Sequence, residues 1–176
     1  MKAKHGKVWV LAADMGYGHQ RAANPFRNMA YERIINMNTD PFTPAKEQQY
    51  WKSMLGLYEF ISRTRKIPVI GNLLYYLMNQ LLKIPDPEAK KDLTRPTFQV
   101  RMLQFQIRRG LCGGVISKIR EKPLPVLTSF YAPAIAADMA GFRDVYCIIC
   151  DSDLNRVWVA GDAAKSRIKY FVPCRE

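Results

Sequence analysis

Two residues of this chain, His19 and Asp151, have the types and positions needed to move a proton. His19 follows the Gly16–Gly18 turn and opens a segment that favours a helix, whereas Asp151 follows a strand-like apolar run. The helix dipole disfavours a charged imidazole, so we expect a neutral ring that can accept a proton. Transfer of a group to a hydroxyl needs such a base, and we assign His19 to this role with Asp151 assisting. The plainer alternative is a histidine that only caps the helix.

The elements around His19 favour a binding turn. The apolar run Val8–Ala13 leads into the glycine turn, and a strand, a glycine turn and a helix together build sites for anions or sugars. A dinucleotide fingerprint asks for a small residue where Arg21 stands, although an acidic residue, Asp40, follows at a suitable distance. Our candidates for binding an acceptor or a phosphate are Gly16, Tyr17, Gly18, Ser129 and Arg156.

The second half of the chain alternates strand and helix patterns. These predict strands at Leu124–Phe130, Asp144–Cys150 and Ile168–Val172, and a helix at Tyr131–Ala140. Such alternation is typical of an α/β protein with a Rossmann-like parallel sheet. The carboxyl ends of parallel strands meet at one edge, so we expect Asp14, the glycine turn, Ser129 and Asp151 to share that edge.

The middle of the chain, residues 45–95, predicts a helical insertion. Glu47–Thr64 and Ile67–Ile84 carry apolar residues at helical spacing, with basic residues between them. This pattern suits helices that lie on a membrane surface, and it equally suits helices that pack against the sheet or a second subunit. The residues predicted to face a membrane are Trp51, Leu55, Tyr58, Leu74, Tyr75 and Leu77. The segment Pro96–Lys122 predicts one long helix that the pair Gly113-Gly114 bends or packs closely.

The charge balance predicts an anionic partner. The chain of 176 residues has 27 Lys and Arg against 15 Asp and Glu, a formal net charge of +12. This excess fits an anionic membrane surface, a phosphorylated substrate or nucleic acid. Nucleic-acid binding has no support other than this charge, because the chain carries no known nucleic-acid motif. We find no signal peptide or spanning segment and expect a cytoplasmic protein, peripheral on the inner face of the membrane.

The cysteines do not predict a metal site. Cys147-x-x-Cys150 has the spacing of a metal pair, but it lies in a strand-like run, where residues three apart point to opposite faces. No second cysteine pair completes a set of four ligands. We therefore expect no metal, and in the cytosol we expect no disulfide.

Three motifs resemble one enzyme group. The turn Gly16–Ala23 resembles the G-x-G-H-x-x-A-A signature in the N-terminal domain of lipid-directed GT-B glycosyltransferases, the monogalactosyldiacylglycerol synthase and processive diacylglycerol glucosyltransferase type. The run Ile148–Asp151, followed by Trp158, is similar to that family's strand ending in Thr-Asp, with Cys150 in place of threonine. The run Tyr170–Pro173 is similar to its last strand.

The resemblance implies one half of a GT-B fold, a single acceptor-side domain over residues 1–176. It implies a lipid acceptor held near His19 and Asp151, with no cofactor bound by this domain. The UDP-sugar donor would bind a C-terminal domain that this sequence lacks, so we expect no transfer by the chain alone. Asp151–Asp153 also spells D-x-D, the metal motif of another glycosyltransferase fold. The alternative function is a Rossmann-like module that binds a membrane or a protein without catalysis.

Overall fold

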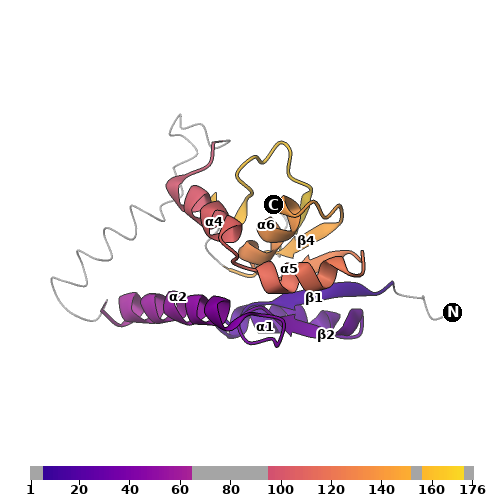
Figure 1. Ribbon diagram of the computed structural model, residues 1–176, viewed down its shortest axis with the longest axis horizontal. Helices are drawn as coiled ribbons and strands as arrows, with labels where there is room; N and C mark the ends of the chain where they lie inside the picture. The colour runs from indigo at the N-terminus through magenta and orange to yellow at the C-terminus, as the bar shows by residue number, and fades with distance from the viewer. Residues whose placement is uncertain (1–5, 65–94, 152–155, 173–176) are drawn as a thin grey trace.

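The chain folds into an α/β domain whose sheet lies between helices. The computed structural model describes residues 6–64, 95–151 and 156–172. Its strands are β1 (Val8–Ala12), β2 (Ala30–Asn36), β3 (Val126–Thr128), β4 (Val145–Ile148) and β5 (Ile168–Phe171). Its α-helices are α1 (Tyr17–Ala23), α2 (Ala45–Thr64), α4 (Phe98–Arg108), α5 (Gly113–Arg120) and α6 (Tyr131–Met139), with 3₁₀ turns at η1 (Asn24–Phe26) and η2 (Arg156–Trp158) (Figure 1).

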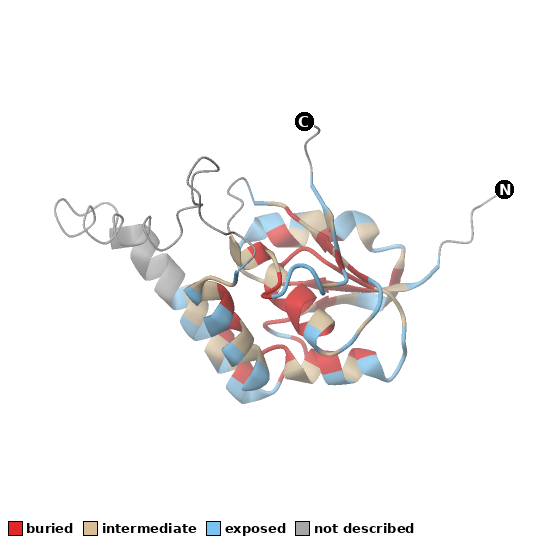
Figure 2. Ribbon diagram, turned by 90° about the horizontal axis from the view of Figure 1, so that it is seen from above, coloured by how far each residue is buried: buried red, intermediate tan, exposed pale blue. Residues whose placement is uncertain are grey.

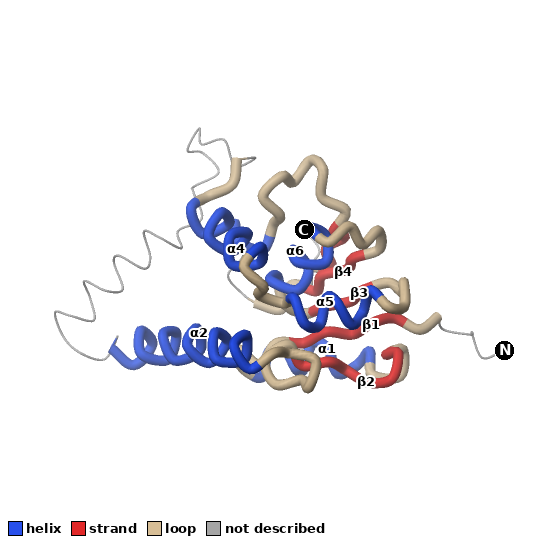
Figure 3. Tube along the Cα trace, viewed as in Figure 1, coloured by secondary structure: helices blue, strands red, loops and turns tan. Residues whose placement is uncertain are grey.

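All five strands are parallel, in the order β2-β1-β3-β4-β5 (Figure 3). Strand β1 lies inside the sheet, with β2 at the edge on one side of it and β3, β4 and β5 in sequence on the other. This confirms the predicted Rossmann-like α/β class. The switch in direction beside β1 brings the carboxyl ends of β1 and β3 together, which is where sheets of this kind hold their ligands.

Alternation along β1 divides the core into two layers. Trp9 and Leu11 point into the larger layer, which α4, α5 and α6 cover, whereas Val10 and Ala12 point into a smaller layer under α1 and η1. The buried residues run through the sheet and the inner sides of the helices (Figure 2). Burial on both sides explains why β1 reads as an uninterrupted apolar run.

Helix α2 begins the predicted insertion, and its first half belongs to the core. Trp51 is fully buried, and its ring lies 6.2 Å from that of Phe130. The prediction that Trp51 faces a membrane is therefore wrong, because this large side chain packs in the core beside Phe130. Leu55 is half-buried. The side chain of Tyr58 and the residues Leu74, Tyr75 and Leu77 lie outside the described residues, as does the predicted helix Ile67–Ile84.

The buried carboxylate of Glu47 ties α2 to the start of α5. It accepts hydrogen bonds from the backbone N–H of Cys112 at 2.8 Å, from that of Gly114 at 3.4 Å and from the indole N–H of Trp51 at 3.3 Å. An acidic group suits this position, because the first N–H groups of a helix lack partners within the helix. Burial nevertheless raises the pKa of Glu47 above its ordinary value.

The predicted long helix Pro96–Lys122 is two helices. The backbone turns between α4 and α5, where Gly110 has φ 109° and Cys112 has φ 66°, both in the left-handed region. Glycine adopts this region readily and ends helices, which is why α4 stops just before Gly110. The helix expected to open at His19 is short: α1 ends at Ala23, before Pro25, and β2 starts at Ala30.

None of the helices in the described ranges has the length and apolar character needed to cross a membrane.

The neighbouring glycines at the start of α5 give a matched test of this packing. A Cβ on Gly114 would lie 2.1 Å from the carbonyl oxygen of Phe42 and 2.5 Å from Cδ of Pro44, whereas one on Gly113 meets nothing within 4 Å. We predict that Gly114→Ala lowers the free energy of unfolding by about 1–3 kcal/mol through overpacking. Gly113→Ala should leave it unchanged or raise it by up to about 1 kcal/mol. Urea unfolding of both variants measures this, and equal stabilities would contradict the packing.

Candidate functional site at the carboxyl edge

Three segments far apart in the sequence meet at the carboxyl edge of the sheet. His19 lies in the first turn of α1, just after β1; Ser129 follows β3; and Cys150 and Asp151 follow β4. The strand order β1-β3-β4 places these ends next to one another. The predicted meeting of His19, Ser129 and Asp151 at one edge is thus what the structure has.

Two hydrogen bonds run in opposite directions between His19 and Ser129. Nδ1 of His19 lies 2.8 Å from the carbonyl oxygen of Ser129, and the hydroxyl of Ser129 donates to the carbonyl oxygen of His19 at 2.7 Å. Both residues are buried. Because one bond holds the ring and the other the backbone, the pair fixes α1 against the end of β3 and sets the direction of the imidazole.

The same contact determines which ring nitrogen carries the proton. A carbonyl oxygen only accepts hydrogen bonds, so Nδ1 of His19 must be the donor and a neutral ring has its lone pair on Nε2. Nε2 lies 3.7 Å from Oδ1 of Asp151, whose side chain is 43% exposed. Nε2, the basic nitrogen of a neutral ring, therefore faces a carboxylate that is partly exposed to solvent.

Aromatic rings pack around the imidazole. The Phe130 ring crosses it edge-on at a centroid distance of 4.8 Å, and the Trp158 ring lies 6.4 Å away. Trp158 is fully buried in the core, and its indole N–H has no acceptor among the described residues. These rings exclude water from one side of His19.

Cys150 lies beside the imidazole but does not form a nucleophilic pair with it. Its Sγ is 3.0 Å from Nδ1 of His19 and 3.5 Å from the carbonyl oxygen of Ser129. Nδ1 already carries a proton and cannot take the one on the thiol. Burial and, second, the charge of Asp151 raise the pKa of the Cys150 thiol to about 11. A nucleophilic cysteine needs the opposite shift, so thiol catalysis is not what this arrangement favours.

The glycine turn is open to solvent at the start of α1. Gly16 has φ 116°, which glycine adopts without strain, and Gly16, Tyr17 and Gly18 are all exposed. Asp14 stabilises the turn: its carboxylate accepts from the side chain of Gln20 at 2.9 Å. The turn thus has an ordered base and an exposed tip beside His19. A role in binding an acceptor or phosphate stays a prediction.

Two predicted binding residues make hydrogen bonds within the protein, and their roles in binding stay predictions. Ser129 is 1% exposed and its hydroxyl donates to the carbonyl oxygen of His19, so it positions the histidine. Arg156 donates to the carbonyl oxygens of Val159 at 2.6 Å and Ala160 at 3.1 Å, which fold its own loop. The sequence missed these roles because main-chain acceptors leave no sequence pattern.

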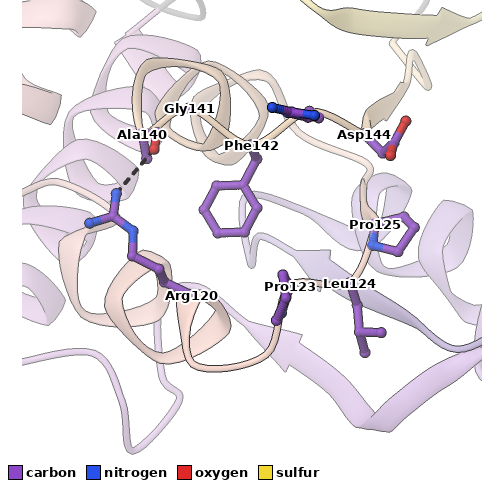
Figure 4. A pocket seen from close by; sticks show the side chains of 9 residues that line it. Arg120, Pro123, Leu124, Pro125, Ala140, Gly141, Phe142 and Asp144 are labelled. Carbon is purple, nitrogen blue, oxygen red and sulfur yellow. Dashed lines mark hydrogen bonds between the residues drawn. The ribbon is translucent and has the colours of Figure 1, made fainter.

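A separate hollow lies at the opposite, amino-terminal edge of the sheet. It has a volume of about 410 Å³, and the Phe142 ring lies across its middle (Figure 4). Arg120 on its wall donates to the carbonyl oxygen of Ala140 at 3.1 Å. Its residues precede β3 and β4, so it shares none with the cluster around His19. Its wall consists of Arg120, Pro123, Leu124, Pro125, Ala140, Gly141, Phe142, Arg143 and Asp144.

The comparisons with known proteins do not assign this chain to a family. Comparison of the chain with protein-family models, with curated proteins and with solved structures finds no match. The geometry at the carboxyl edge, together with the motifs in the sequence, therefore carries the functional argument.

The His19–Ser129 pair can be tested against a serine of the same chemistry elsewhere. Ser53 also donates to a backbone carbonyl, that of Gln49 at 2.9 Å, but it is exposed. We predict that Ser129→Ala lowers the free energy of unfolding by roughly 1–3 kcal/mol, because the bond lost is buried. Ser53→Ala should change it by less than about 0.5 kcal/mol. Urea unfolding measures both. An unchanged free energy of unfolding in Ser129→Ala would contradict the role of Ser129 in holding His19 in place.

Proposed function

We propose that this chain is the acceptor-binding N-terminal domain of a nucleotide-sugar-dependent glycosyltransferase that acts on a lipid at a membrane surface. The observation that carries the proposal is the geometry of His19. Its Nδ1 side is held by Ser129, and its Nε2 lone pair faces the half-exposed Asp151 at the carboxyl edge of a parallel sheet. The G-x-G-H-x-x-A-A resemblance supports the same assignment.

The chemistry follows from that geometry. Nε2 of His19 accepts the proton of the lipid hydroxyl while its oxygen bonds to the anomeric carbon of the sugar. The bond from that carbon to the nucleotide diphosphate breaks, and its electron pair leaves with the diphosphate. Asp151 stabilises the imidazolium that forms, since its carboxylate lies beside the nitrogen that gains the proton. The UDP-sugar would be held by a separate donor domain, as the resemblance to GT-B glycosyltransferases implies.

Helix α4 supports a membrane location. Phe98, Met102 and Phe105 recur on one face and are 67%, 42% and 49% exposed. The exposed residues Arg101 and Arg108 lie on the same helix, and the exposed Arg109 directly follows it. Apolar side chains flanked by arginines suit the boundary between acyl chains and anionic headgroups. In this proposal α4, and not Trp51, contacts the membrane, and the domain is a peripheral protein on the cytoplasmic face.

The experiment uses the full product of the source gene and vesicles that contain phosphatidylglycerol and diacylglycerol. Labelled UDP-glucose and UDP-galactose serve as donors, and lipid-bound label is counted. We predict that His19→Ala lowers transfer about 10²–10⁴-fold, the usual contribution of a general base, while co-sedimentation with vesicles is unchanged. His5→Ala, at the only other histidine of the chain, is the matched control and should keep full activity. Full transfer by His19→Ala would contradict the proposal.

The alternative is a module that binds membranes without catalysis, and the exposed face of α4 favours it. The same vesicles distinguish the two functions. Phe98→Ser with Phe105→Ser should weaken co-sedimentation under both, whereas Phe171→Ser, at an exposed phenylalanine on β5, should not. The alternative would be established by two results together. The unmodified protein would transfer sugar from none of the donors tested, and its binding to vesicles would depend on α4.

A further inference from the structure

We propose that His19, Cys150 and Asp151 form a binding site for a divalent transition metal, with Zn²⁺ as the best-suited ion. The site goes beyond the proposed function and does not rest on it, because it requires only the three side chains and no sugar or lipid. We expected no metal site from the sequence, because only two local motifs were considered, the Cys147–Cys150 spacing and the D-x-D triplet. Residues that the fold brings together from distant segments do not form such a motif.

The ligand atoms are already close. One ring nitrogen of His19, Sγ of Cys150 and a carboxylate oxygen of Asp151 lie within 4.8 Å of one another. Ligand atoms around a tetrahedral zinc ion are roughly 3.5 Å apart, given bonds of about 2.0–2.3 Å. Sγ of Cys150 now lies 3.0 Å from Nδ1 of His19, so its side chain has to rotate toward Nε2 to share an ion there. Cys150 is half-buried and Asp151 is exposed, which leaves both side chains room to rotate.

The histidine is oriented as a metal ligand would be. Histidines that bind metals usually donate the hydrogen of the other ring nitrogen to a backbone carbonyl or a carboxylate, which fixes the tautomer. In this site the carbonyl of Ser129 plays that part for Nδ1 of His19, at 2.8 Å. Nε2 keeps its lone pair and lies 3.7 Å from the Asp151 carboxylate, so a cation between these two atoms would contact both.

The set of donors selects the class of metal. A thiolate, an imidazole and a carboxylate suit Zn²⁺ and similar ions, whereas Mg²⁺ and Ca²⁺ prefer oxygen alone. Three protein ligands leave a fourth position for water or an anion, as in zinc sites that are open to solvent. Cys147 is not part of this group: it is buried, with Sγ 3.8 Å from the carbonyl oxygen of Phe130. Cys150 lies beyond the end of β4 at Ile148, so the argument from strand alternation, which placed both cysteines in one strand, does not apply to it.

Metal binding would compete with the proton transfer assigned to His19. A cation on Nε2 occupies the lone pair that would take the proton and also neutralises Asp151. If the proposed function holds, zinc is an inhibitor of transfer. If it fails, the site still binds metal, so the two proposals are tested separately.

The test uses the purified chain after dialysis against a chelator, titrated with Co²⁺ and then with Zn²⁺. Bound Co²⁺ should give one equivalent and a thiolate-to-cobalt charge-transfer band, which Zn²⁺ then abolishes. Cys150→Ser should remove the band, and Cys150→Ser and Asp151→Asn should each weaken Zn²⁺ binding about 10-fold or more in competition with a chromophoric chelator. Circular dichroism checks that the variants are folded.

Matched controls exclude adventitious ligands. Cys174→Ser, His5→Ala and Asp162→Asn each remove a group of the same type from another part of the sequence and should leave the band and the affinity unchanged. The proposal is overturned if the unmodified chain binds no Co²⁺ at micromolar concentrations. It is also overturned if the band persists in Cys150→Ser or disappears in Cys174→Ser.

Discussion

The reciprocal hydrogen bonds between His19 and Ser129 are the interaction on which the carboxyl edge depends. They join the start of α1 to the end of β3, two elements from opposite halves of the chain, through contacts of 2.8 and 2.7 Å between buried residues. The sheet makes them possible, because β3 pairs directly with β1. A single pair of residues thereby sets the place of the helix, the tautomer of the imidazole and the direction of its free nitrogen.

The imidazole of His19 consequently has two different sides. Toward the interior it meets Ser129 and the ring of Phe130, and these contacts hold it still. Toward the surface it presents Nε2 to Asp151, whose carboxylate reaches solvent. A nitrogen held in this way can take a proton from a hydroxyl or bind a cation, and it cannot do both at once. The two proposals for this edge are therefore two uses of one lone pair.

Much of this arrangement can be predicted from the sequence because parallel topology alone brings strand ends together. The order of the strands is enough to predict that His19 and Asp151 lie at the same edge. The role of Cys150 was hidden, since its contact with His19 depends on how the chain leaves β4. Trp51 was misassigned because an apolar side chain at helical spacing suits a membrane and a core equally. The break before α5 was missed because Cys112, which no propensity favours there, takes the left-handed conformation.

The most direct test of the account is the protonation of the His19 ring, measured by nitrogen NMR through the long-range couplings of its carbon-bound protons. At pH 8, in metal-free buffer, we predict that Nδ1 carries the hydrogen and that Nε2 has the shift of an unprotonated nitrogen. The His5→Ala variant assigns the signals. A ring protonated at Nε2 instead would contradict the account, because the lone pair would then face Ser129 and neither a hydroxyl nor a metal ion could use it.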